Sequence, residues 1–333
     1  MFYKKFFTIV ILGCTALACS RKEATCELDK SITETVLDLS VERLEDQFFA
    51  ADSEADLLFL MEAHPEFTQQ YLQLEKYSSK EELAQALWEV KQDSLMQELY
   101  SEVKGHFSDF SKIEQDLKSA FQHLKYYFPG FKMPKIYTFV GGFDGDLIVS
   151  DDLIVIGLDF FLPLTHRFQP PDLPQYISKR YQADYIVPMV MMAISSKYNK
   201  TDLKVNTLIS EMIYYGKAYH FTKSMMPCTS DEFIIGYTQE EIAACFANEE
   251  FIWAHFIEND LLFETNPFEI RKYTGEAPFT DEISPDAPGR IGRWLGWNIV
   301  DDYRFNKSVP LPQLMAETDI DKIFRQSGYK PRR

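Results

Sequence analysis

The segment from Leu203 to Phe221 constrains the fold of this chain more than any other stretch. Apolar and aromatic residues recur along it at the spacing of one helix face: Leu203, Val205, Leu208, Met212, Tyr215 and Tyr219. This pattern predicts a long helix that buries one side. We therefore expect it to be the central helix of the body, with the other elements arranged around it.

The centre of this helix matches the helix of a zinc peptidase at the glutamate but not at the two metal-binding histidines. In zinc peptidases of the gluzincin kind, two His one helical turn apart flank a Glu, because zinc needs imidazole groups that converge on one point. Here Glu211 keeps the position of the glutamate, but Ser210 and Tyr214 stand where the His would be. No two of the six His of the chain lie three to five residues apart. The sequence predicts a zincin-like helix with a degenerate metal site, no bound metal and no cofactor.

Three acidic residues are the candidates for chemistry near this helix. Glu211 lies about 80° around the helical wheel from the centre of the apolar face. Such a boundary carboxylate is solvated, caps a loop, or acts as a general base in a groove. Glu249 and Glu250 follow on the next predicted helix, where a gluzincin places its third, carboxylate ligand. The alternative for this pair is a structural contact with Arg or Lys.

The first residues predict export and a lipid anchor. Lys4 and Lys5 precede an apolar run that ends in small residues at Ala18, which is too short to span a bilayer and is typical of a secretory signal. Small residues before Cys19 are the pattern that signals diacylglycerol transfer to a cysteine sulfur. There are two alternatives. Cys14 could be the lipidated residue, or the segment could be an ordinary cleaved signal in which Cys19 stands by chance. We expect a signal peptide over 1–18, a flexible tether over 19–40 and a single domain over 41–333.

Charge and cysteine content narrow the possible partners. The formal net charge is −17, which would repel nucleic-acid phosphates and the surface of an anionic membrane. Cys26 falls in the predicted tether, whereas Cys228 and Cys245 fall in the body. The favoured state of the two body cysteines is a pair of buried free thiols, and a bridge between them is the alternative.

The order of the periodic segments predicts an α+β fold. Helical patterns fill 41–128, strand-like runs follow at 135–140, 147–149 and 153–156, and helical patterns return at 186–198 and after it. Turn residues separate the three strands, which predicts a small antiparallel sheet. Because helices, a strand meander and more helices follow one another without a crossover pattern, we expect one mostly helical zincin-like body.

A glycine-containing helix near the C-terminus is expected to approach the central helix closely. Gly292 and Gly296 lie four residues apart on the helix predicted over 290–303, where they remove side chains from one face. Trp294 and Trp297 on the same helix are either core residues or a platform for a ligand. The candidate groove residues are Glu249, Glu250, Arg290, Trp294 and Trp297.

Several strings of the sequence resemble one family. They include HLKYYFP at 123–129, MIYYGK at 212–217, NEEFIW at 248–253 and PGRIGRWLGW at 288–297, with shorter strings at 156–159, 235–238, 256–259 and 277–279. Over about 41–333 the chain is similar to the GldB-type gliding-motility lipoproteins of the Bacteroidetes. That family in turn resembles predicted zinc peptidases, from which this chain departs at Ser210 and Tyr214.

The resemblance implies a cell-envelope lipoprotein needed for gliding and linked to the type IX secretion machinery. Its partners would then be envelope proteins of that apparatus, and the body would face the periplasm from the outer or the inner membrane. We expect a non-catalytic component or assembly factor and not an enzyme. Two alternatives remain open: a peptidase-like hydrolase that uses Glu211, and a lipoprotein that binds an envelope peptide or glycan near Trp294 and Trp297.

Overall fold

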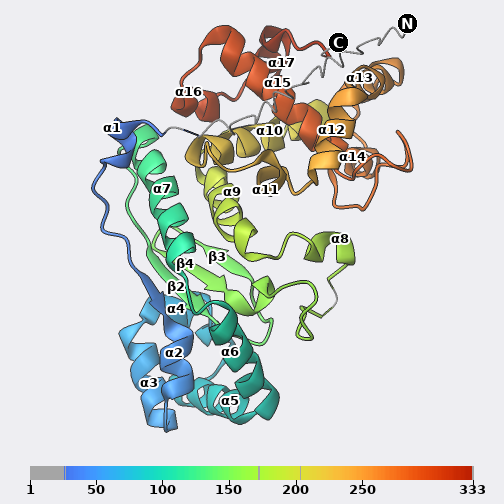
Figure 1. Ribbon diagram of the computed structural model, residues 1–333. Helices are drawn as coiled ribbons and strands as arrows, with labels where there is room; N and C mark the ends of the chain where they lie inside the picture. Colours follow the sequence, from blue (N-terminus) through green and yellow to red (C-terminus); the bar gives the residue numbers. More distant parts are fainter. Residues whose placement is uncertain (1–25, 27, 172, 203, 332–333) are drawn as a thin grey trace, which may run out of the picture.

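The computed structural model describes residues 26–331 except 27, 172 and 203 (Figure 1). A small sheet lies in the middle, with one group of helices (α2–α6) on one side and a larger group (α10–α17) on the other. The predicted signal peptide and Cys19 lie outside the described residues. Within the described part of the chain, no helix combines the length and the hydropathy that crossing a membrane requires.

Short helices make up most of the N-terminal half. The elements before the second strand are α1 (Lys30–Thr33), β1 (Val41–Arg43), α2 (Leu44–Ala50), α3 (Glu54–Ala63), α4 (Pro65–Gln70), α5 (Lys80–Gln92), α6 (Ser94–His106) and α7 (Ser111–Tyr127). The helical pattern predicted over 41–128 is divided among several helices, and α5 and α6 are separated by the single residue Asp93. Asp93 causes the break, because its carboxylate accepts hydrogen bonds from the backbone N–H groups of Leu95 and Met96 and so caps α6.

The sheet is mixed, and the prediction of an antiparallel sheet was wrong. Its strands are β1, β2 (Lys135–Phe139), β3 (Leu147–Val149) and β4 (Leu153–Gly157), in the order β1-β2-β4-β3. β1 and β4 both run parallel to β2, and only β3 is antiparallel to its neighbour β4. The missed strand, β1, has three residues, too few for a period of two to appear in the sequence. The chain from β1 to β2 passes through α2–α7, which is the crossover that a parallel pair requires.

Helices dominate after the sheet, as the sequence predicted. They are α8 (Gln175–Ser178), α9 (Ile186–Tyr198), α10 (Leu208–Met225), α11 (Asp231–Ile235), α12 (Gln239–Ala247), α13 (Glu249–Glu258), α14 (Pro267–Thr274), α15 (Ile291–Lys307), α16 (Leu311–Ala316) and α17 (Ile320–Ser327). The predicted central helix is α10. It begins after Thr207, whose hydroxyl caps it by accepting a hydrogen bond from the backbone N–H of Ser210.

Helices α10 and α15 cross with their backbones in contact. A Cβ added to Gly296 would lie 1.9 Å from the carbonyl oxygen of Met212, and one added to Gly216 would lie 2.3 Å from the carbonyl oxygen of Gly296. The close approach of Gly296 to the central helix is therefore confirmed. Gly292 faces a different neighbour, because a Cβ there would meet the carbonyl oxygen of Tyr273 at 3.0 Å.

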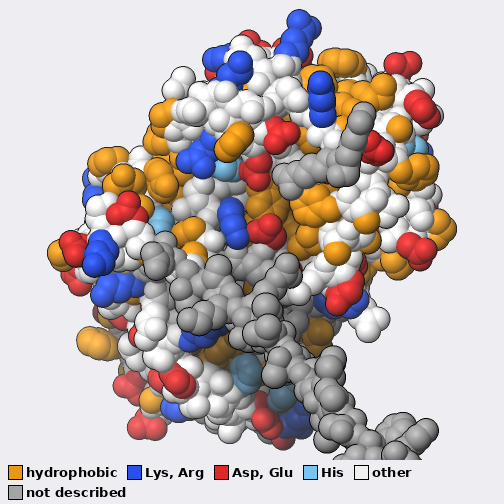
Figure 2. Space-filling view, turned by 45° about the horizontal axis from the view of Figure 1, so that its top comes forward, with side chains coloured by type: hydrophobic (Ala, Val, Ile, Leu, Met, Phe, Trp, Pro, Cys, Tyr) orange, Lys and Arg blue, Asp and Glu red, His pale blue; other side chains and the backbone are white. Residues whose placement is uncertain are grey.

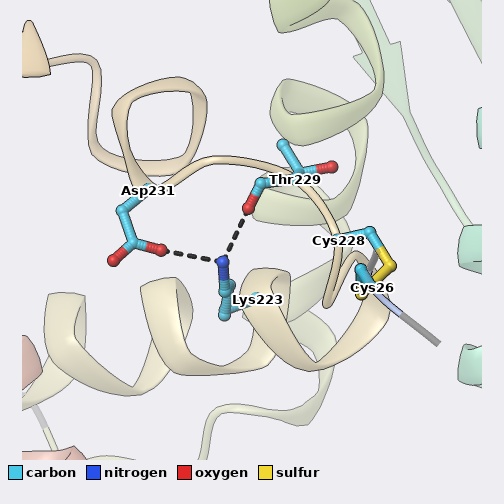
Figure 3. The surroundings of a disulfide bond; sticks show 5 residues. All are labelled: Cys26, Lys223, Cys228, Thr229 and Asp231. Atoms are coloured by element: carbon cyan, nitrogen blue, oxygen red, sulfur yellow. Dashed lines mark hydrogen bonds and ion pairs between the residues drawn. A yellow bond between two sulfur atoms is a disulfide. The ribbon is translucent and has the colours of Figure 1, made fainter. Parts of the chain in front are cut away.

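A disulfide ties the N-terminal segment to the end of α10. Cys26 and Cys228 are bonded across 202 residues of sequence, just after α10 ends (Figure 3). The loop that carries Cys228 is fixed by Lys223, which donates a hydrogen bond to the carbonyl of Thr229 and pairs with Asp231. The predicted free thiol at Cys228 and the alternative bridge from Cys228 to Cys245 were thus both wrong, whereas Cys245 is a buried free thiol as expected.

The described part of the predicted flexible tether is packed on the body. Helix α1 contacts α7, and Ile32 is buried in that contact. The side chain of Gln122 on α7 donates hydrogen bonds to the carbonyl oxygens of Thr33 and Thr35 at 2.6 and 2.9 Å. For Cys26 and residues 28–40 the tether prediction was therefore wrong. The contacts that hold this segment join residues 87 to 202 positions apart, and local sequence patterns do not predict contacts between residues so far apart.

The α10–α15 crossing predicts that alanine substitutions at two helical glycines change the free energy of unfolding by different amounts. Gly296→Ala should lower the free energy of unfolding by about 3 kcal/mol or more, because its Cβ would overlap a backbone carbonyl that cannot move alone. Gly105→Ala, at a helical glycine with nothing within 4 Å of the added Cβ, should leave stability unchanged or raise it by up to about 1 kcal/mol. Urea unfolding of both variants checks this. Equal stabilities would contradict the described crossing.

The disulfide predicts a large stability difference between oxidised and reduced protein. Replacing both Cys26 and Cys228 by Ser should cost about 2–5 kcal/mol, because the bond closes a very long loop and restricts the unfolded chain. Unfolding of the reduced wild-type chain should then match unfolding of the double variant. An oxidised wild type no more stable than the double variant would show that the two cysteines are not joined.

Candidate functional site

A cavity of about 700 Å³ lies where the sheet meets the C-terminal helices. Its walls come from β3, from the α8–α9 segment, from α10 and α11, and from the segment joining α14 to α15. We call it the tyrosine–arginine cavity after the tyrosines and arginines in its lining: Tyr181, Tyr185, Tyr214, Tyr215, Tyr219, Arg180, Arg290 and Arg293. Its size is that of a site for a small organic ligand.

The remaining walls of the cavity are mainly apolar. Leu147 and Val149 of β3 line one part, and Pro188, Met189 and Met192 of α9 line another. Helix α11 and its C-terminal end contribute Phe233, Ile234, Ile235 and Gly236. Methionine side chains are flexible and adapt their shape to what they contact. The cavity therefore combines an adaptable apolar surface with a few polar groups, which is the usual composition of a binding pocket.

Three arginines converge on one glutamate at this cavity. Arg180 lies 2.7 Å, Arg293 3.1 Å and Arg290 3.5 Å from the carboxylate oxygens of Glu276. Burial by itself would raise the pKa of Glu276, but the guanidinium groups of Arg290, Arg180 and Arg293 outweigh it and lower that pKa. Glu276 is therefore ionised at neutral pH, and the cluster keeps an excess of two positive charges.

Local backbone geometry positions two of these arginines. Arg290 is the N-cap of α15 in the left-handed region (φ 65°), and its guanidinium donates a hydrogen bond to the carbonyl of Ile235 at 2.9 Å. Gly236 follows at φ +75°, and a Cβ there would lie 2.4 Å from Cδ of Arg180. A glycine is thus required at this position for Arg180 to reach the cluster. Arg293 stacks over the ring of Tyr215, 3.9 Å from its centroid.

The window 210–214 does not form a zinc site. Ser210 is buried, and its hydroxyl has no hydrogen-bond partner among the described residues. Glu211 is half-buried in the first turn of α10 and does not line the tyrosine–arginine cavity, whereas Tyr214 does. Across the described ranges, no group of three or more His, Cys, Asp or Glu is arranged to hold a metal ion. These residues do not fit a zinc centre.

Glu249 and Glu250 lie outside the cavity. Glu249 is buried at the start of α13, where its carboxylate accepts a hydrogen bond from the hydroxyl of Tyr329 at 2.7 Å. Glu250 is exposed to solvent. The expected Arg or Lys partner of this pair stays a prediction, and the hydrogen bond from Tyr329 ties Glu249 to the C-terminal segment.

Trp294 and Trp297 belong to the core. Only 2% of Trp294 and 7% of Trp297 is exposed. Trp294 contacts the ring edge of Phe246, with centroids 5.2 Å apart, and Trp297 packs on Tyr219 at 5.5 Å. Both line only a narrow pocket of about 130 Å³. Of the five groove candidates, Arg290 alone lines the tyrosine–arginine cavity.

Sequence reasoning missed a His–Asp pair at a second cavity. His220 on α10 places Nδ1 2.5 Å from a carboxylate oxygen of Asp301 on α15. Its Nε2 is buried without a hydrogen-bond partner among the described residues. Both residues line a cavity of about 750 Å³ together with Arg304, Phe305 and Ser308. The pair is separated by 81 residues, so its only signal in the sequence would have been the helical spacing on two crossing helices.

Lys217 is a buried cation on the central helix. Its side chain is fully buried, and its ammonium group donates hydrogen bonds to the carbonyl of Glu317 at 2.8 Å and the hydroxyl of Thr201 at 3.1 Å. Burial lowers the pKa of Lys217 to about 7, and the nearby charge of Glu317 opposes this only in part. Lys217 thus links α10 to the segment after α16.

Comparison with known proteins gives one match. The family model described as "Gliding motility protein GldB" matches residues 25–331. No curated protein and no solved structure matches the chain significantly. The zincin-like part of the fold prediction therefore stays a prediction.

The pKa of Lys217 predicts a pH-dependent contribution to stability. An unfolded Lys keeps its proton up to about pH 10.4, whereas Lys217 loses it near pH 7. Between these values the unfolded state binds more protons, so this group makes the folded state more stable as pH rises. Relative to Lys217→Met, the wild type should gain on the order of 1–2 kcal/mol from pH 7 to pH 9. Urea unfolding of both proteins at several pH values measures this, and a constant difference would contradict it.

Proposed function

The chain belongs to the GldB gliding motility family, and from this premise we propose that it is a non-catalytic, lipid-anchored component or assembly factor of the gliding-motility and type IX secretion machinery. The observation that carries the proposal is the chemistry of α10. Of the two positions that would hold the His ligands of a zinc peptidase, one carries the buried Ser210 and the other carries Tyr214, which lines the cavity beside the arginine cluster. Such a surface is suited to holding a partner or ligand.

The placement of Glu211 supports a role without catalysis. A general base must come within hydrogen-bond reach of the proton that it removes. Glu211 does not line the tyrosine–arginine cavity, and Ser210 beside it is buried. Glu211 is therefore not among the groups that a ligand in the cavity would contact, which argues against a hydrolase that uses Glu211 on such a ligand.

The disulfide supports export and limits how far a lipid at Cys19 could lie from the body. Disulfides form and persist in oxidising compartments such as the bacterial periplasm, in agreement with the predicted signal peptide. Cys19 precedes Cys26 by seven residues, which can span at most about 25 Å. With Cys19 lipidated, the loop that carries Cys228 just after α10 would lie close to the membrane, and the body would face the periplasm.

The proposed partners are other envelope proteins of the same machinery. The surface in Figure 2 carries scattered acidic and basic side chains with hydrophobic side chains gathered between them. A mixed surface of this kind suits docking to proteins, and the net charge of −17 disfavours nucleic acid.

An envelope ligand-binding role is the second candidate. It is favoured by the tyrosine–arginine cavity, not by the region of Trp294 and Trp297 from which the sequence had suggested it. The two roles are compatible, since a bound ligand can stabilise the form of the protein that docks.

The proposal predicts that Glu211 is dispensable in a gliding host. A deletion strain should regain motility and secretion when it expresses Glu211→Gln, because no step requires a base at this position. Cys19→Ser should fail to restore either, because the protein loses its anchor. Spreading on agar and secreted protein are the measurements, with immunoblots of membrane fractions as the control for expression.

Two outcomes would contradict this proposal. One is a Glu211→Gln protein that is present at the wild-type level but restores neither motility nor secretion. The other is peptide hydrolysis by the purified wild-type chain that Glu211→Gln abolishes.

A further inference from the structure

The tyrosine–arginine cavity carries positive charge that the protein itself does not balance. Arg180, Arg290 and Arg293 share the single carboxylate of Glu276. The other acid in the lining, Asp146 before β3, accepts hydrogen bonds from the hydroxyl of Tyr181 and the backbone N–H of Leu147. Three arginines against these two carboxylates leave the lining with a formal charge of +1. The cavity thus remains positive in a chain whose net charge is −17.

The three guanidinium groups are held largely out of water. Their side chains are 20% (Arg180), 7% (Arg290) and 11% (Arg293) exposed. Removing a charge from water is costly unless partners replace the lost hydration. The carbonyl oxygens of Ile235 and Thr274 accept some of the hydrogen bonds, but Nε of Arg180 is buried and has no partner in the described chain. An anion in the cavity would offset part of the electrostatic cost of holding the three guanidinium groups out of water.

Helix α15 adds to the same potential. It is 17 residues long and starts at the cavity wall, where its N-cap Arg290 and Arg293 are both lining residues. Its first turn has no acidic residue, and no side chain caps its N-terminus. The positive end of the helix dipole therefore has no acid of its own first turn beside it, and Glu276 is the carboxylate that it shares with the guanidinium groups. The dipole thus adds to the attraction of an anion to this place.

The rest of the cavity is suited to an apolar group. Met189, Met192 and Pro188 lie on α9, and the rings of Tyr214 and Tyr215 lie on α10. A free inorganic ion would not cover these apolar side chains, which would remain in contact with water. A volume of about 700 Å³ also exceeds what a small inorganic anion needs.

We propose that the tyrosine–arginine cavity binds an amphipathic organic anion. A carboxylate or phosphate headgroup would contact Arg180 and Arg293 near Glu276, and an acyl chain or ring would lie against the methionines and tyrosines. The inference deepens the proposed function and rests on it in one respect, that the ligand is held and not turned over. The headgroup chemistry is shared by acyl lipids and soluble organic acids.

The test is a titration of the purified full-length mature chain with four probes. Octanoate and octyl phosphate should each bind at one site per chain by calorimetry. Octyl glucoside, which has the same chain and no charge, and inorganic phosphate, which has the charge and no chain, should bind at least tenfold more weakly. Native mass spectrometry of protein extracted from host membranes distinguishes the sources, since an acyl lipid and a soluble acid differ in mass.

Two variants should change the affinity in opposite directions. Arg180→Gln should weaken octyl phosphate binding about tenfold, the usual effect of losing one charge-assisted contact. Glu276→Gln removes the competing carboxylate and should tighten binding severalfold. General structural damage would not tighten binding. Arg325→Gln is the matched control, because that arginine on α17 is 77% exposed.

Circular dichroism shows whether each variant is folded. If Glu276→Gln does not fold, the affinity of Arg180→Gln compared with that of the wild type still decides the test. Equal binding of octyl glucoside and octyl phosphate, or an unchanged affinity in Arg180→Gln, would overturn the inference. Loss of binding would leave the proposed function intact as long as Glu211→Gln restores motility. Failure of Glu211→Gln would instead count against the proposed function.

Discussion

The contact between the backbones of α10 and α15 determines how the rest of the C-terminal half is arranged. Gly216 and Gly296 let the two helices meet without side chains between them. Because the helices are so close, the residues flanking the contact are fixed relative to one another. Trp297 is held against Tyr219 in the core, while Arg293 is held over Tyr215 at the cavity. One steric requirement therefore sets both the core and the wall of the tyrosine–arginine cavity.

Local patterns predicted the parts of this arrangement that depend on nearby residues. The central helix and the approach of Gly296 follow from helical spacing, which the sequence displays directly. The parallel pairing of β1 with β2, the bond between Cys26 and Cys228 and the meeting of Arg180 with Glu276 join residues about 95 to 200 positions apart. Such contacts depend on how whole elements pack. Arg290 was found because it stands in a conspicuous glycine-rich string, whereas Arg180 has no comparable signal.

The disulfide and the charge distribution of the chain agree with a protein that binds a ligand or a partner in the cell envelope. The disulfide joins the segment that follows the predicted anchor to the end of the same helix that lines the cavity. Binding in the cavity and attachment to the membrane would therefore act on one rigid element, α10. A positive cavity in a protein of net charge −17 also limits where an anion can be attracted, since the remaining surface repels it.

A crystal structure of the chain purified from the membranes of its host, with anomalous data collected at the zinc edge, tests the non-catalytic interpretation of α10 most directly. The expected result is organic density beside Arg180 and Arg293 and no anomalous peak near Glu211. A stoichiometric metal ion coordinated by Glu211 would contradict it.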